Sequence, residues 1–176
     1  VSGACLRTAT LVLGQPDFNS LDTGLGPNRL RNQTGIATDG NVLAVADTDN
    51  NRVLIWLHMP TANGQPADVV VGQKDFNSAA AVSPTQNSLR APSGVWIYGG
   101  KLFDADTFDN RVLIYNQIPT KNYAAADVVL GQPSFTSFVQ PDLTQTNGSA
   151  SSSNMQTPVS VTTDGTHLFV SDLAQN

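Results

Sequence analysis

Residues 35–57 read GIATDGNVLAVADTDNNRVLIWL, and residues 94–116 read GVWIYGGKLFDADTFDNRVLIYN. The two stretches belong to one longer repeat, because residues 35–78 realign on residues 94–137 with an offset of 59. Of the 44 aligned positions, 22 are identical. Self-similarity at a fixed period of this size is the sequence signature of a repeat architecture.

A short motif recurs in the same phase of each unit. It begins at Leu13, Val71 and Leu130 and reads LGQPDF, VGQKDF and LGQPSF, with spacings of 58 and 59 residues. A further, partial copy begins at Pro158, where the offset from the second copy is 66. The seven extra residues lie at 147–153 and read NGSASSS, a composition typical of a flexible loop insertion.

Each unit contains four strand-like segments, which in the first copy are residues 35–38, 42–46, 52–57 and 68–71. The Asp-Gly pair that follows the first segment favours a hairpin turn. An Asn-rich run separates the second and third segments in the same way. Four short strands in a meander, repeated at a fixed period, are typical of the blades of a β-propeller.

We therefore predict an all-β fold, a β-propeller of four-stranded antiparallel blades, in a single repeat domain over residues 1–176. The expected parts are blade 1 (35–78), blade 2 (94–137), a partial blade 3 (158–176) and the outer strand of a split blade (9–18). About two complete blades leave unpaired strand edges, which proteins normally cover. A six-bladed ring would need either more chain or a second subunit, so a homodimer that completes the ring is one expected assembly.

The bulk composition argues against two classes of partner. The formal net charge is −5 and only nine residues are Lys or Arg, which disfavours binding to nucleic acid. No apolar run approaches the ~18 residues of a membrane span. Cys5 is the single cysteine, so the chain forms no intrachain disulfide.

The runs GIATDG (35–40), LAVAD (43–47) and NNRVLIW (50–56) resemble the NHL repeat, and the second copy carries their counterparts. The long linker and the GQPDF motif are similar to a bacterial long-repeat subtype of NHL proteins. This resemblance implies a six-bladed ring and an extracytoplasmic location, either secreted or periplasmic. The second copy departs from the first where Phe108-Asp109 replaces Asp49-Asn50.

Several polar residues recur in the same phase of the repeat, and we interpret them as structural. They are Asp47, Asn51, Arg52, Asp106, Asn110, Arg111 and Asp172. The run from Asp47 to Asn51 superficially resembles a calcium loop, with oxygen ligands on alternate residues. The second copy replaces Asp49 by Phe108, so the alternative of carboxylates that fix a turn is preferred.

Trp96 and Tyr98 break the repeat, because the first copy has Ala37 and Asp39 at these positions. The NHL resemblance implies that the first strand of each blade lines a central channel. An aromatic pair near the axis is a candidate ligand-binding site, to which Asp39 and Asp164 are added as the carboxylates nearest the axis. Ordinary packing against larger neighbours is the alternative for the two aromatic side chains.

The function expected from these features is a non-catalytic binding or scaffold module that presents loops to a protein or glycan ligand. The sequence has no His, Cys or carboxylate cluster with metal-ligand spacing, no nucleophile elbow and no Walker loop. We accordingly predict no catalytic residue, no metal ligand and no cofactor. The alternative is a metal-dependent, lactonase-like hydrolase or lyase whose axial site is completed by further blades or a partner subunit.

Overall fold

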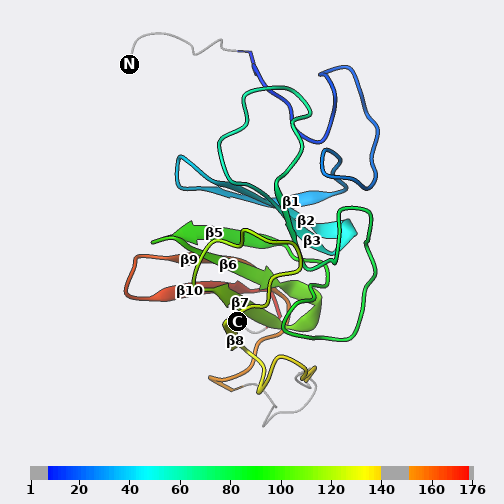
Figure 1. The fold of residues 1–176 in the computed structure, drawn as a ribbon. Helices are drawn as coiled ribbons and strands as arrows, with labels where there is room; N and C mark the ends of the chain where they lie inside the picture. The colour runs from blue at the N-terminus through cyan, green and yellow to red at the C-terminus, as the bar shows by residue number, and fades with distance from the viewer. Residues whose placement is uncertain (1–7, 140–150, 175–176) are drawn as a thin grey trace.

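The computed structural model describes residues 8–139 and 151–174 (Figure 1). These residues form two four-stranded antiparallel sheets and one two-stranded hairpin, which we call the first sheet, the second sheet and the C-terminal hairpin. Within the described ranges the chain has no α-helix, only two short 3-10 turns. No described helix has the length and apolar character to cross a membrane.

The first sheet has its strands side by side in chain order, as a meander requires. Its strands are β1 (Gln33–Thr38), β2 (Leu43–Asp47), β3 (Arg52–Trp56) and β4 (Val69–Val71). Every residue of β2, β3 and β4 is buried, because the sheet is covered on both faces. This explains why the central strands read as continuous apolar runs instead of alternating with polar residues.

The second sheet repeats this order, and the C-terminal hairpin repeats its first half. The strands are β5 (Gly94–Tyr98), β6 (Lys101–Asp106), β7 (Arg111–Tyr115), β8 (Val128–Leu130), β9 (Pro158–Thr163) and β10 (Leu168–Asp172). The 3-10 turns η1 (Thr48–Asn50) and η2 (Thr107–Asp109) join the second strand of each sheet to the third. Most of the inserted run at 147–153 and the last two residues of the chain lie outside the described residues.

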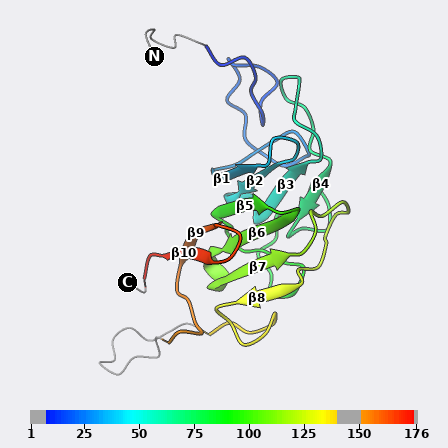
Figure 2. The same cartoon turned by 90° about the vertical axis from the view of Figure 1, so that its left-hand side faces the viewer.

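The sheets stack face to face in chain order, and their first strands are neighbours. β1 lies beside β5, and β5 lies beside β9, at one edge of the stack (Figure 2). Gly35 and Gly94 permit this approach: a Cβ on Gly35 would lie 2.5 Å from the carbonyl oxygen of Ser93, and one on Gly94 would lie 2.7 Å from that of Val159. Glycine is needed at these positions because only a residue without a side chain lets the backbones come this close.

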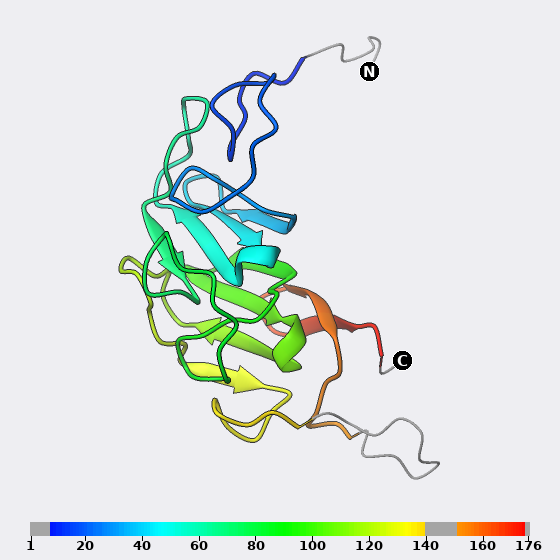
Figure 3. The ribbon, with the colours of Figure 1, turned by 90° about the vertical axis from the view of Figure 1, so that its right-hand side faces the viewer.

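Residues 9–18 differ from expectation, because the structure assigns no strand to them. They lie with the rest of the N-terminal segment on the side of the first sheet that faces away from the second sheet (Figures 1 and 3). A strand is defined by a ladder of hydrogen bonds to a neighbour. No strand of the described residues pairs with this segment, so it stays outside any sheet.

Asn51 and Asn110 end the two 3-10 turns in the left-handed conformation, with φ of 53° at both. Each side chain also reaches the next repeat unit. The Oδ1 of Asn51 accepts the Ala91 N–H at 2.8 Å, and the Oδ1 of Asn110 accepts the Thr157 N–H at 3.0 Å. Asparagine combines tolerance of positive φ with an amide that bonds across the interface.

Two variants of Asn110 separate these roles. Asn110→Gly keeps the backbone conformation but loses the bond to Thr157, and we expect it to lower the free energy of unfolding by about 1 kcal/mol. Asn110→Ala loses the same bond and adds left-handed strain, which costs about 1 kcal/mol more. Urea denaturation measures both. Equal losses for the two variants would contradict the role assigned to the backbone.

Candidate functional site

The neighbouring strands β1, β5 and β9 border a groove of about 390 Å³. Its wall includes Ile36 from β1, Trp96 from β5 and Thr162 from β9. One strand from each of three repeat units thus contributes to the same groove. The other lining residues are glycine, serine, threonine and valine, so the Trp96 indole is the one aromatic group among the lining residues.

Trp96 and Tyr98 lie on the same side of β5, because side chains alternate along a strand. The residues between and before them, Val95 and Ile97, are buried in the core between the two sheets. Trp96 is 37% exposed and Tyr98 is 46% exposed. The two aromatic residues that break the repeat are therefore accessible side chains, as a role in binding requires.

Tyr98 also borders a second cavity, of about 330 Å³, between the second sheet and the C-terminal hairpin. Its lining includes the apolar side chains of Phe103 and Leu168 and the polar side chains of His167 and Lys101. The phenol of Tyr98 stands so close over the hairpin turn that a Cβ on Gly165 would collide with it. Trp96 and Tyr98 thus face two adjoining hollows on one side of β5.

Asp39 and Asp164 lie in the turns of the β1–β2 and β9–β10 hairpins. The Oδ1 of Asp39 accepts the N–H groups of Asn41 and Val42 at 2.9 and 2.8 Å. The Oδ1 of Asp164 accepts those of Thr166 and His167 at 2.8 and 2.7 Å. These backbone hydrogen bonds hold the pKa of both carboxyls below the ordinary value. The geometry explains both residues as turn formers, and a part in ligand binding stays a prediction.

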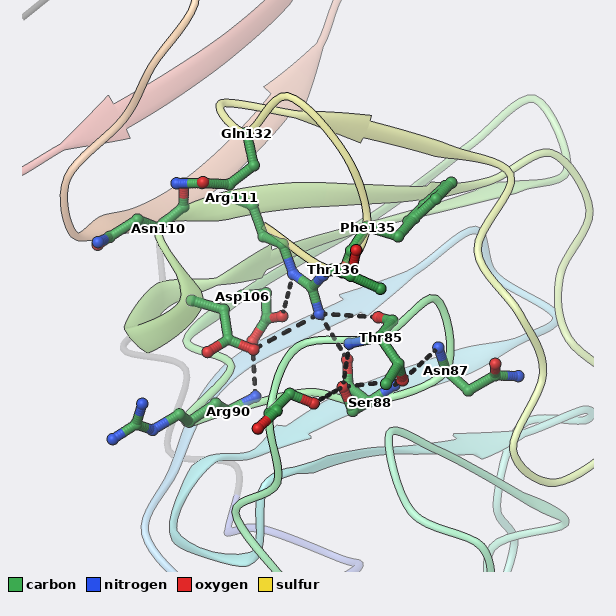
Figure 4. Close-up of polar contacts among 12 residues, drawn as sticks. Thr85, Asn87, Ser88, Arg90, Asp106, Asn110, Arg111, Gln132, Phe135 and Thr136 are labelled. Atoms are coloured by element: carbon green, nitrogen blue, oxygen red, sulfur yellow. Dashed lines mark hydrogen bonds and ion pairs between the residues drawn. The ribbon is translucent and has the colours of Figure 1, made fainter. Parts of the chain in front are cut away.

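The arginine of each sheet is fully buried and makes matching contacts. The Nε of Arg52 lies 2.7 Å from Asp47 Oδ2, and the Nε of Arg111 lies 2.7 Å from Asp106 Oδ2. Arg111 also donates to three backbone carbonyls: from Nη1 to Phe135 at 2.6 Å, and from Nη2 to Thr85 and Ser88 at 3.1 and 2.9 Å (Figure 4). The guanidinium group therefore fixes the linker between β4 and β5, residues 72–93, to the second sheet.

The aspartate that ends the second strand of each unit also holds the segment before the first strand. Asp47 accepts the Arg31 N–H at 2.6 Å, Asp106 accepts that of Arg90 at 2.6 Å, and Asp172 accepts that of Gln156 at 2.7 Å. All three bonds are in the same phase of the repeat. The repeat-locked polar residues thus have a structural role in the described residues, and none of them borders the groove.

Sequence reasoning did not single out Asp104, a buried carboxylate in the middle of β6. Its partners across the ladders, Val95 and Leu113, both belong to the apolar core between the two sheets. Neither carboxylate oxygen has a hydrogen-bond partner among the described residues, and the hydroxyl of the buried Tyr115 has none either. The alignment of the two copies does contain a signal for this residue, because the first copy has the apolar Val45 where the second has Asp104.

Burial raises the pKa of Asp104 well above the ordinary value, and the nearby Asp106 carboxylate raises it further, against the lowering effect of Arg111. Burial, with the charges of Asp104 and Asp106, likewise raises the pKa of the Tyr115 hydroxyl. A neutral carboxylic acid is therefore the form that this interior favours. The buried carboxyl of Asp104 therefore lowers the stability of the fold. The first sheet has Val45 at this position and contains no such group.

Asp109 is a second departure of the same kind. The first copy has Asn50, whose Nδ2 donates to the Gly24 carbonyl and to Asp47 Oδ2, both at 2.9 Å. A carboxylate has no such donors, and Asp109 instead lies 3.5 Å from the Nη2 of Arg111. Burial raises its pKa, and the charge of Arg111 lowers it. Two carboxylates, those of Asp106 and Asp109, thus pair with one guanidinium group in the second sheet.

The candidate metal ligands do not gather. Within residues 8–139 and 151–174, no three His, Cys, Asp or Glu side chains are placed to hold a metal ion. His167 pairs instead with Asp164, with 3.2 Å between Nδ1 and Oδ2. Cys5 lies outside the described residues.

Comparison of the chain with protein-family models and with curated proteins finds no match. The resemblance to NHL repeats therefore stays a prediction, and it rests on the in-phase Asp, Asn and Arg residues of the two full units.

Proposed function

We propose that the two sheets are consecutive blades of an NHL-type β-propeller, an extracytoplasmic ring of six blades. Three features support this. The units are four-stranded meanders with one strand order, they stack in chain order, and their first strands adjoin at one edge of the stack. Further units of the same kind, from a longer chain or a second subunit, would complete the ring.

We further propose that the propeller is a non-catalytic binding module for a protein or glycan ligand. The observation that carries this proposal is the position of Trp96 and Tyr98. They are accessible, they break the repeat, and they flank hollows formed between units. Tryptophan and tyrosine combine a large apolar surface with a polar group, which suits them to contact surfaces that are partly wet. The in-phase polar residues, by contrast, are already engaged within the fold.

The enzyme alternative draws less support from the same residues. A metal-dependent hydrolase or lyase would need carboxylates aimed at the axis. The two nearest candidates, Asp39 and Asp164, direct Oδ1 at backbone N–H groups of their own turns. Tyr98 occupies the corresponding position of the second sheet and supplies no metal-binding carboxylate.

Binding is tested by screening the protein on an oligosaccharide array and a peptide array, followed by titration calorimetry of the best ligand. We expect Trp96→Ala to weaken that binding at least ~10-fold, the size of effect seen for central aromatic contacts. Phe108→Ala is the matched control, since Phe108 is an exposed aromatic residue on η2, away from the groove. Its affinity should equal that of the unaltered protein.

Two results would overturn the proposal. One is equal affinity for the Trp96→Ala and Phe108→Ala proteins. The other is turnover of a substrate in a lactonase and lyase screen that is lost when a single residue of β1, β5 or β9 is replaced. Thermal melting of each variant shows that a loss of binding does not come from a loss of fold.

A further inference from the structure

The side of the first sheet that faces away from the second sheet, which we call the leading face, is covered over β2 and β3 but is exposed along β1. It includes Leu43, Val45 and Leu54, and residues of the N-terminal segment such as Leu13 pack on it. At its inner edge Ile36 is 69% exposed, whereas Val95, the same position of the second sheet, is 5% exposed. The difference arises because the first sheet covers Val95 and no described element covers Ile36.

The two interfaces between consecutive units of the chain show which hydrogen bonds form across such a face. The hydroxyl of Thr48 donates to the Pro92 carbonyl at 2.8 Å, and the hydroxyl of Thr107 donates to the Pro158 carbonyl at 2.7 Å. Each threonine begins the 3-10 turn of the preceding unit. The carbonyl in the same phase on the leading face is that of Gln33, and no described hydroxyl reaches it.

The second recurring contact ends the same turn. Asn51 and Asn110 accept the N–H groups of Ala91 and Thr157, as described above. The residue in phase with Ala91 and Thr157 is Asn32, which holds the same left-handed backbone, with φ of 51° against 48° and 66°. Among the described residues nothing accepts its N–H. The leading face thus presents one acceptor and one donor already in position for a turn that carries Thr and Asn.

The third observation concerns the segment around Val12. Its N–H donates to Asn63 Oδ1 at 3.0 Å, and its C=O accepts the Gly64 N–H at 2.9 Å. Val70 of β4 makes the same two bonds to Asn122 and Tyr123, at 3.0 and 2.9 Å. Residues 11–13 therefore hold the position of a fourth strand relative to the first sheet, without a third strand beside them.

Comparison with β4 shows where the backbone groups of Leu11 and Leu13 point. Because both backbone groups of Val70 point to the next unit, the alternation of an antiparallel ladder leaves Val69 and Val71 to bond β3. By the same alternation Leu11 and Leu13 direct their N–H and C=O groups to the side where a third strand would lie.

We propose that the leading face receives a preceding unit of this same repeat and the same polypeptide. That unit has three strands and a Thr-Xaa-Asx-Asn turn, and it takes residues 11–13 as its fourth strand. The source is the same chain because in both sheets the third strand joins the fourth through a local connection, residues 57–68 and 116–127. The inference is independent of any ligand in the groove.

The C-terminal hairpin of a second copy does not meet these requirements. Leu173 stands where Thr48 and Thr107 stand, and it has no hydroxyl to donate. Ser160 stands where Gly35 and Gly94 let the next first strand approach, and its Cβ would meet that backbone. A homodimer closed through this face is therefore the less favoured assembly.

The test is a fusion that places a copy of residues 33–58 directly before Val1. With the offset of 58 between the first motif copies, residue 59 corresponds to residue 1, so the natural connection to residues 11–13 is reproduced. Amide hydrogen exchange is compared with the unfused chain. We expect the N–H groups of Leu11, Leu13 and Asn32 to exchange at least ~10-fold more slowly in the fusion. Val12, already bonded to Asn63, should be protected in both proteins.

The matched control is the same fusion with Thr48→Val and Asn51→Gly made only in the added copy. It should lose the protection of Asn32. The proposal is overturned if Leu11, Leu13 and Asn32 exchange equally fast with and without the added unit, or if the fusion fails to fold where the unfused chain folds. It is also overturned if light scattering finds the unfused chain to be a dimer in which these three N–H groups are protected.

Discussion

Replacing Arg111 by methionine is expected to lower the free energy of unfolding by about 3–5 kcal/mol, the usual cost of removing one partner of a buried ion pair. The Arg111 side chain is fully buried, and its guanidinium group donates to Asp106 and to three backbone carbonyls. Methionine fills a similar volume but donates nothing. Asp106 would remain as a buried carboxylate whose nearest cation is gone.

Urea denaturation followed by tryptophan fluorescence gives the loss. Arg90→Met is the matched control, because Arg90 is a repeat-locked arginine whose side chain is exposed. Its effect should stay within about 0.5 kcal/mol, as for most surface substitutions. Arg52→Met should also destabilise the chain, since Arg52 makes the corresponding hydrogen bonds in the first sheet and lacks only the contact that Asp109 adds to Arg111. A loss below 1 kcal/mol for Arg111→Met would show that the network does not hold the linker.

Much of the fold could be predicted because the repeat supplies its own comparison. A position that stays Asp, Asn or Arg in both copies was expected to be structural. In the structure, Asp106, Asn110 and Arg111 make hydrogen bonds within the fold. The strands lie within two residues of their expected bounds, since the turns between them use residues with strong turn preference. The strand expected over residues 9–18 was not found. A strand needs a neighbouring strand to pair with, and the sequence of a segment does not show whether that neighbour is present.

The candidate site could be predicted only in part. Trp96 and Tyr98 stood out because they are large residues that break the repeat, and both are accessible. Asp104 broke the repeat as well, but its meaning depends on burial. That burial comes from the stacking of two sheets, which neither unit shows alone. A change from Val to Asp on a strand would be ordinary at the surface, so the sequence offered no reason to weigh it.

Asp104→Val should therefore raise the free energy of unfolding at neutral pH by about 1–3 kcal/mol, the cost of a buried polar group without a partner. Valine is the residue that the first sheet carries at this position, where Val45 is buried. The substitution removes the carboxyl from an apolar interior and leaves similar volume behind. Thermal melting at pH 7 of the variant and the unaltered protein measures the gain.

The gain should depend on pH. The folded protein raises the pKa of Asp104 above its ordinary value of 3.8, so folding takes up a proton between the two values. The buried carboxyl of Asp104 accordingly destabilises the unaltered protein least below pH 3.8. The protein loses stability as the pH rises from 3.8 through the raised pKa. The advantage of Asp104→Val should be smallest in acid and should grow toward neutral pH. Asp106 and Asp109 also titrate nearby, so the comparison is the difference between the two proteins at each pH.

Two controls separate charge from packing. Asp104→Asn keeps the shape and the polarity but cannot ionise, so its stability difference from Asp104→Val should not change with pH. Val45→Asp places the same carboxyl in the first sheet and should destabilise the chain. If the advantage of Asp104→Val is equally large at pH 4 and pH 7, the carboxyl is not held neutral by its surroundings. Its cost would then come from poor packing beside Tyr115 and Leu113, and not from the burial of a titratable group between the two sheets.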